Sequence, residues 1–365
     1  MLFESERYHS DVKPTARNWV SQDSFPATKQ FFSYLVSLHI FSLLPASNRP
    51  SRLHCFFSST NPLGRRILTT MKIAFLGLGK MGTAVVGRLL QAGHTVSAWN
   101  RSPKSLQELE IPSATLLPSV RAAVETCDVV CTMLANDEAT EAVAFGSEGL
   151  LAALRPNAVH IALGTLSVAL SRRLMESHAA AGQRYVAAPV FGRPNVASQG
   201  RLWVVAAGDD STLAHVRTVL DAIGRGVTIV GNKPPQAHAF KLGGNFMISA
   251  MVQTISEAFV FASAEGIDPE LFLETVNEAL FQSPFYLNYG RVMLHPPEHP
   301  GATVLLGEKD IRLFREATQS AGVRLGLAEY LQEQFNVAIR SGLGKTDWAV
   351  GQYRMAEQAS KNKPS

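Results

Sequence analysis

Cysteine is scarce in this chain, with three among 365 residues: Cys55, Cys127 and Cys131. An odd and sparse set argues against a disulfide framework and suits a reducing compartment. Cys127 and Cys131 have no histidine or further cysteine at metal-ligand spacing, so we expect no metal site. We interpret both as small apolar residues in or near a buried strand.

A strong charge bias is also missing. The net charge is +4, charged residues make up 18% of the chain, and the basic residues are not gathered into long runs. Nucleic-acid-binding domains usually carry a basic patch or stripe, so we expect no nucleic-acid partner. The length and the 46% of hydrophobic residues favour two domains with sizeable cores.

The first 70 residues lack acidic side chains after Asp23 and combine an apolar stretch at 31–44 with arginines and serines. The stretch is short for a bilayer span, and a secretory signal is not expected because no basic flank or clean cleavage site accompanies it. The segment is interpreted as a disordered extension, a transit segment, or a mis-called start before Met71. We expect a cytoplasmic protein, or a mitochondrial or plastid one if the segment is a transit peptide.

Alternating strands and helices follow from Lys72 onward. Strands are expected at 72–77, 95–99, 128–134, 158–163, 185–189 and 202–207, and helices at 80–90, 120–125, 139–153 and 168–181. This alternation predicts an α/β domain of the Rossmann type, with a doubly wound and largely parallel sheet.

Strand signals stop after Gly231, and helices are expected at 237–265, 269–280, 309–322 and 327–342. The sequence therefore predicts a nucleotide-binding domain at 71–234, an all-helical substrate and dimerisation domain at 235–350, a long helix that joins them, and a tail at 351–365. The apolar run 246–264 contains Gln253, Ser256 and Glu257, which favours a buried core helix over a membrane span.

A glycine-rich turn lies between the first strand and the first helix: Gly77, Leu78, Gly79, Lys80, Met81 and Gly82. Gly77 permits the tight turn, Gly79 lets the backbone approach a pyrophosphate, and Gly82 allows close packing of helix on strand. The helix N-terminus then offers free N–H groups to phosphates. Such a turn at these offsets predicts a dinucleotide cofactor.

The end of the second strand indicates which dinucleotide. Many NAD-binding proteins place Asp or Glu there to accept a hydrogen bond from the ribose, but this chain has Asn100, Arg101 and Ser102. Arg101 can form a charge-assisted pair with a 2′-phosphate, and Ser102 can donate to it. NADP is the expected cofactor and NAD stays possible; the alternative for Arg101 is a solvated surface side chain.

Together with Gly93-His94-Thr95-Val96, these motifs resemble the start of the β-hydroxyacid dehydrogenases, which include 3-hydroxyisobutyrate dehydrogenase and the glyoxylate/succinic semialdehyde reductases. The resemblance continues in order to about residue 345. It implies a fold like that of 6-phosphogluconate dehydrogenase, an NAD(P)-dependent oxidoreductase acting on CH–OH groups, and a homodimer or homotetramer. The residues that it assigns to the cofactor are Met133, Leu134, Ala135, Thr165 and Lys309; to the substrate, Thr165, Val190, Phe191, Gly192 and Arg193; and to catalysis, Lys241 and Asn245.

The residues around Lys241 make the same assignment plausible without the resemblance. Lys241 and Asn245 are four residues apart on an expected helix and share one face. Their neighbours are apolar and small, so burial should lower the pKa of Lys241 toward the range useful for proton transfer. Gly243 and Gly244 are unfavourable inside a helix, which close approach of a ligand or another backbone would explain. Spacing alone leaves open a lysine that extends to the surface.

The hypothesised reaction passes hydride from NADPH to the carbonyl carbon of a small aldehyde or keto acid while Lys241 protonates the oxygen. The substrate loop departs from the family pattern, because Phe191 and Arg193 stand where Ser and Gly are usual, and Gly164 replaces a Ser. Phe191 would favour an apolar substituent, and Arg193 could pair with an anion or turn outward. Imine reduction and a non-catalytic NADP-binding scaffold stay open as alternatives, although Lys241 counts against both.

Overall fold

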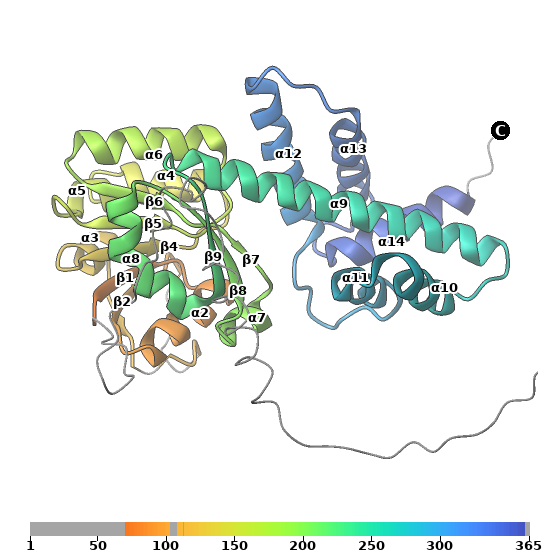
Figure 1. Ribbon diagram of the computed structural model, residues 1–365, viewed down its shortest axis with the longest axis horizontal. Helices are drawn as coiled ribbons and strands as arrows, with labels where there is room; N and C mark the ends of the chain where they lie inside the picture. Colours follow the sequence, from red (N-terminus) through yellow and green to blue (C-terminus); the bar gives the residue numbers. More distant parts are fainter. Residues whose placement is uncertain (1–69, 103–107, 112, 362–365) are drawn as a thin grey trace, which may run out of the picture. The chain divides into compact units, whose positions relative to one another are not determined.

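The computed structural model describes residues 70–102, 108–111 and 113–361. The interpretations of residues 1–69 as an extension, a transit segment or a mis-called start lie outside this part of the chain. Figure 1 shows the described elements in sequence colours.

The described strands form one nine-stranded sheet in the order β3-β2-β1-β4-β5-β6-β8-β7, with β9 paired to β8. Pairing is parallel from β3 to β6, whereas β8 runs antiparallel to β6 and β7. This arrangement confirms the Rossmann-type sheet. The strands are β1 (Lys72–Leu76), β2 (Thr95–Trp99), β3 (Thr115–Leu116), β4 (Val129–Thr132), β5 (Val159–Ala162), β6 (Arg184–Ala187), β7 (Val190–Phe191), β8 (Leu202–Ala207) and β9 (Gly224–Gly231).

Helices cover both faces of this sheet, so the central strands β1, β4 and β5 are buried and mostly apolar, as expected for a parallel sheet. In β1, Ile73 and Phe75 pack with α2 and α8, whereas Ala74 and Leu76 pack on the opposite face with α3 to α5. Cys131 lies in β4 and is fully buried, which confirms its interpretation as a small apolar strand residue.

The helices of this part are α2 (Lys80–Gln91), α3 (Val120–Val124), α4 (Asp137–Phe145), α5 (Leu150–Ala153), α6 (Val168–Ala180), α7 (Pro194–Ser198) and α8 (Asp210–Ile223). The expected continuous helix over 139–153 was wrong, because the chain turns between α4 and α5. A Cβ at Gly149 would lie 2.8 Å from the carbonyl oxygens of Val143 and Gly146, so the turn is closed tightly around this glycine. Helices α7 and α8 and strands β3, β7 and β9 were also not predicted from the sequence.

After β9 the described chain is helical: α9 (Pro235–Ala264), α10 (Pro269–Val276), a π-helical turn η3 (Asn277–Phe281), α11 (Pro284–Leu294), α12 (Val304–Ser320), α13 (Gly326–Arg340) and α14 (Trp348–Lys361). The expected helix at 269–280 changes to π-helical geometry in its last turn, and α12 begins five residues earlier than expected. The expected tail at 351–365 is corrected, because it is helical as far as Lys361 and its first residues are buried.

The long joining helix is α9, which has 30 residues and packs against α10 to α14 as well as against α6, β8 and β9. By length and hydropathy alone it could cross a membrane, a test that the core helix of a soluble protein also passes. Val252, Ile255 and Phe259 anchor it in the core of the helical part. The same helix carries Lys241 and Asn245 toward its N-terminal end.

Candidate functional site

The glycine-rich turn after β1 has the geometry that its sequence predicts. Gly77 has a φ of 105°, and a Cβ there would collide with the carbonyl oxygen of Met133; a Cβ at Gly82 would collide with that of Gly77. Neither position therefore accepts a side chain. Gly79 is different, because no atom lies within 4 Å of its ideal Cβ position. The backbone is open at the place where a phosphate group would approach.

Helix α2 begins directly after this turn, and neither a capping side chain nor an acidic residue occupies its first turn. Its first N–H groups are therefore free to bind an anion. A cavity of about 320 Å³ borders the turn. Its lining residues are Leu78, Gly79, Lys80, Thr83, Glu108, Leu109, Glu110 and Pro194. The open glycine, the uncapped helix and the cavity together fit the pyrophosphate of a dinucleotide.

Asn100 fixes the end of β2 against the turn. Its Oδ1 accepts a hydrogen bond from the backbone N–H of Leu78 at 2.9 Å, and its Nδ2 donates to the carbonyl of Ser102 at 2.8 Å. Both polar atoms of the Asn100 side chain thus form hydrogen bonds with the protein backbone. Arg101 and Ser102 are exposed beside it and carry the polar groups that face outward.

The loops after β4 and β5, expected to lie along the cofactor, contact each other closely. A Cβ at Gly164 would lie 3.1 Å from the carbonyl oxygen of Leu134, so a serine at this position would crowd the neighbouring loop. The departure at Gly164 therefore has a steric reason. Met133 also donates its N–H to the carbonyl of Leu76, which ties its loop to the end of β1.

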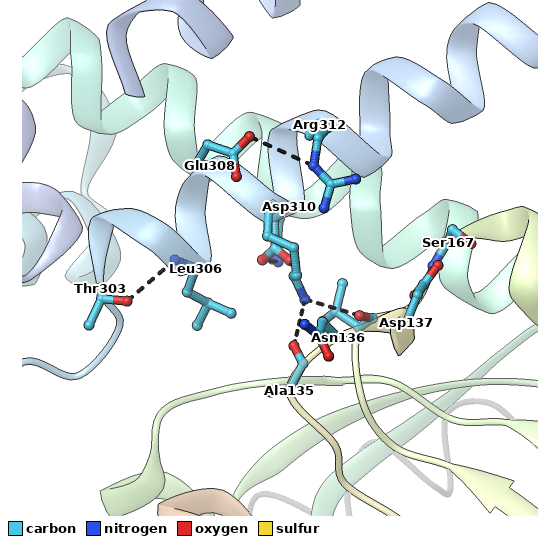
Figure 2. Close-up of polar contacts among 12 residues, drawn as sticks. Ala135, Asn136, Asp137, Ser167, Thr303, Leu306, Glu308, Asp310 and Arg312 are labelled. Atoms are coloured by element: carbon cyan, nitrogen blue, oxygen red, sulfur yellow. Dashed lines mark hydrogen bonds and ion pairs between the residues drawn. The ribbon is translucent and has the colours of Figure 1, made fainter. Parts of the chain in front are cut away.

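Lys309 of α12 joins these two loops to the helical part. Figure 2 shows Ala135 of the first loop facing Asp310 of α12. Its Nζ donates to the carbonyl oxygen of Thr165 at 3.1 Å and to that of Ala135 at 3.4 Å. The same Nζ lies 3.0 Å from Asp310 Oδ1, within ion-pair distance. The side chain is almost completely buried, so its charge is balanced by these oxygens rather than by water.

Asp310 follows Lys309 directly in the sequence and is not among the predicted site residues. The structure places it between two expected site residues, because its Oδ2 accepts a 2.6 Å hydrogen bond from Asn245 Nδ2. Asn245 and Asp310 are both buried, and 65 residues of chain separate them. The adjacency to Lys309 was the only sequence signal for this residue.

Lys241 is buried on the same helix as Asn245, with 8% of its surface exposed. The pKa of its ammonium group is lowered to about 8, chiefly by burial; the negative charge of Asp310 raises this pKa, and the positive charge of Lys309 lowers it. Among the residues that the structure describes, no carboxylate forms an ion pair with Lys241. Both protonation states are therefore accessible near neutral pH, as a group that gives and takes protons requires.

The substrate loop expected at residues 190–193 begins at β7, where Val190 is buried. The ring of Phe191 covers the Lys241 amine, with Nζ 4.0 Å from the ring centroid. The ring also fills the space next to Gly244, since a Cβ there would collide with it. A side chain, rather than the expected ligand or backbone, thus explains Gly244; nothing lies within 4 Å of the Cβ position of Gly243.

Arg193, the last residue of the expected substrate loop, contacts the helical part of the protein. Its Nη1 lies 3.8 Å from Asp347 Oδ2, and its guanidinium lies over the Tyr289 ring, 4.8 Å from the centroid. Asp347 is buried and also accepts backbone N–H groups from Gly301 and Ala349. The anion that Arg193 meets is a carboxylate of the protein itself, so Arg193 links the substrate loop to the helical part.

A chain of buried histidines supports the end of β4 and was not found from the sequence. Gln183 Nε2 donates to two backbone carbonyls, which leaves its Oε1 to accept from His178 Nδ1 at 2.8 Å. His178 Nε2 must then accept from His160 Nδ1, and His160 Nε2 from Thr132, each at 2.9 Å. Burial lowers the pKa of His178 to about 4. Both rings are therefore neutral, and they fix Thr132 directly before the 133–135 loop.

Family models match both parts of the chain. Residues 72–231 match the NAD binding domain of 6-phosphogluconate dehydrogenase, and residues 236–351 match the NAD-binding domain of NADP-dependent 3-hydroxyisobutyrate dehydrogenase.

Individual proteins agree with these models. The uncharacterized oxidoreductase YfjR of Bacillus subtilis is 36% identical over 281 residues, covering 77% of this chain and 98% of that protein. The chloroplastic glyoxylate/succinic semialdehyde reductase 2 of Arabidopsis thaliana is 28% identical over 299 residues, covering 82% and 83%. The structure of Mycobacterium tuberculosis 3-hydroxyisobutyrate dehydrogenase with L-serine has a TM-score of 0.70 at 25% identity, covering 79% and 99%. With the fold and the dinucleotide turn, these matches establish that the chain belongs to the β-hydroxyacid dehydrogenase family of NAD(P)-dependent oxidoreductases.

Proposed function

We propose that this protein reduces the carbonyl group of a small aldehyde or keto acid to the alcohol, and catalyses the reverse oxidation, with Lys241 as the general acid and base. The observation that carries the proposal is the buried Lys241, whose pKa of about 8 allows it to donate and accept a proton. NADPH, when bound, supplies the hydride. The proton for the carbonyl oxygen comes from the Lys241 ammonium, which becomes a neutral amine.

NADP is the cofactor that we propose, because Arg101 and Ser102 are exposed at the end of β2 and no acidic residue stands in their place. The turn at Gly77–Gly82 and the uncapped start of α2 would hold the pyrophosphate. The loops at 133–135 and at Thr165 would lie along the remainder of the cofactor, and Lys309 keeps both loops in position through their carbonyl oxygens.

Asn245, Thr165 and the backbone at 190–192 are proposed to orient the substrate. Asn245 is held by Asp310 through its Nδ2, which leaves its Oδ1 to face a substrate hydroxyl. Arg193 is not included in this proposal, because Asp347 and Tyr289 already engage it. Imine reduction is the second candidate, and the apolar ring of Phe191 beside Lys241 is the observation that favours it.

The pH dependence of the two directions tests the role of Lys241. Its folded-state pKa is lowered to about 8, so the ammonium is present below that pH and the amine above it. We expect kcat/KM for carbonyl reduction to fall as the pH rises through about 8, and kcat/KM for alcohol oxidation to rise there. The measurement is kcat/KM in both directions between about pH 6 and 10.

The Asp310→Asn variant sharpens this test. Asp310 raises the pKa of Lys241, so its removal should lower that pKa further. The fall of kcat/KM for reduction and its rise for oxidation should then both occur at lower pH. An asparagine keeps an oxygen that can accept from Asn245. Glu308→Gln, two residues earlier on α12, is the control and should leave the pH dependence of both directions unchanged. If kcat/KM changes at the same pH in Asp310→Asn as in wild type, the assignment of this pH dependence to Lys241 is contradicted.

We also propose that copies of the chain pair through an apolar surface on α9, α10 and η3. Phe261, Leu271 and Leu280 are 63%, 60% and 71% exposed, and α10 contacts both α9 and η3. Large apolar side chains exposed on neighbouring elements can form an interaction site. Phe259, on the same helix as Phe261, is a core residue and is not part of this surface. Light scattering should give a dimer or tetramer, and Phe261→Glu with Leu271→Glu should give monomers. A monomeric wild type would refute the proposal.

A further inference from the structure

We propose that the substituent next to the reacting carbonyl is apolar and uncharged, and that Phe191, seated against Gly244, selects it. This inference rests on the proposed function, because it takes Lys241 as the group that meets the carbonyl oxygen. It names the class of substrate as an aldehyde or ketone with an alkyl or aryl group on the side that faces Phe191.

The position of the Phe191 ring carries the first step. Its centroid lies 4.0 Å from Lys241 Nζ, so the ring is within van der Waals reach of a substituent on a carbonyl group that takes a proton from Nζ on that side. The ring of Phe240 lies edge-on to Phe191, at a centroid distance of 6.5 Å. The surface beside the acid is therefore aromatic and offers no hydrogen bond to a hydroxyl or carboxylate.

Gly244 leaves the space that the Phe191 ring occupies. It lies in the interior of α9, where glycine destabilises a helix relative to alanine. Any Cβ at this residue would collide with the Phe191 ring. The glycine therefore provides the notch that the ring fills, and the ring position depends on both residues.

The second step concerns the interactions that the nearby lysine and arginine side chains already make. Lys309 is within ion-pair distance of Asp310 and donates to two carbonyl oxygens, and Arg193 is engaged by Asp347 and Tyr289. Lys241 has no ion-pair partner among the described residues, but the reaction uses it at the carbonyl oxygen. A carboxylate placed against Phe191 would lose its water without gaining a cation, which is strongly unfavourable.

An isosteric pair of aldehydes tests the inference. Isocaproaldehyde and succinic semialdehyde have the same chain and differ in that an isopropyl group replaces the carboxylate. With the full chain and NADPH, kcat/KM for isocaproaldehyde should exceed that for succinic semialdehyde by roughly tenfold or more. The unreactive amides isocaproamide and succinamate, measured by calorimetry on the NADPH-loaded protein, should bind in the same order.

Two variants should reduce this preference by different routes. Phe191→Ser removes the ring, and Gly244→Ala keeps the ring but fills its notch; each should lower the ratio of the two kcat/KM values about tenfold. Phe191→Leu keeps an apolar side chain and should keep the preference for isocaproaldehyde. The temperature midpoint of unfolding identifies a variant that fails to fold. If Phe191→Ser or Gly244→Ala fails in this way, the ratio measured for the other one tests the inference.

The outcomes separate this inference from the proposed function. A wild type that turns over both aldehydes but prefers succinic semialdehyde would overturn the inference and leave the carbonyl reductase intact. Unchanged ratios in folded Phe191→Ser and Gly244→Ala would overturn the role of Phe191. If NADPH binds but no carbonyl compound is reduced, the proposed function fails, and the order of binding of the two amides still tests selection by the ring.

Discussion

Replacement of Lys241 by methionine is expected to slow hydride transfer by about 10²- to 10⁴-fold, the usual contribution of a positioned general acid. Methionine has a similar length and fills the same buried space, but it carries no proton. The carbonyl oxygen would then gain negative charge beside the Phe191 ring, with no donor from Lys241 to neutralise it. Single-turnover NADPH oxidation with saturating aldehyde measures this step directly.

The control for this variant is cofactor binding. Lys241 lies on α9, outside the turn and the cavity at Gly79, so the dissociation constant of NADPH should stay close to that of wild type. The free energy of unfolding should not fall, because a buried amine is replaced by an apolar side chain. Hydride transfer at a rate near that of wild type would remove Lys241 from the mechanism.

The Arg101→Asp variant is expected to reverse the cofactor preference, with a change of about 100-fold or more in the ratio of kcat/KM for NADPH to that for NADH. Arg101 is exposed at the end of β2, where its guanidinium can form a charge-assisted pair with the 2′-phosphate of NADP. Aspartate repels that phosphate, and in NADH it can accept a hydrogen bond from the ribose hydroxyl. Steady-state kinetics with both cofactors give the ratio.

Arg354→Asp is a matched control, because it makes the same change of charge at an exposed position on α14. It should leave the cofactor ratio unchanged, since long-range effects of exposed charges are screened by salt. If Arg101→Asp changes the ratio no more than Arg354→Asp does, then Arg101 is a solvated surface side chain and the NADP preference has another origin.

The part of the fold that the sequence predicted is the part with local signals. The turn at Gly77–Gly82 could be identified because its glycines stand at fixed offsets between a strand and a helix. Gly77 and Gly82 answer steric demands, and Gly79 leaves the backbone open. Strand and helix alternation likewise gave the parallel sheet. The break between α4 and α5 was missed, because apolar periodicity continues across Gly146 and Gly149 and hides the turn.

The site was harder to predict where its partners are far apart in the chain. Lys241 and Asn245 share one helix and could be paired by their spacing, but Asp310 meets Asn245 only because α12 packs against α9. The pairing of Arg193 with Asp347 has the same cause. Gly244 looked like a site for a ligand or a close backbone, and only the packed ring of Phe191 explains it.

The central claim is that this chain reduces carbonyl groups, and its most direct test is NADPH oxidation by the full chain. The panel consists of small aldehydes, semialdehydes, glyoxylate and cyclic imines, with product identified by mass. The account predicts that aldehydes or keto acids are reduced to alcohols and that Lys241→Met slows this turnover by about 10²- to 10⁴-fold. Reduction of cyclic imines alone, with no carbonyl compound accepted, would contradict it.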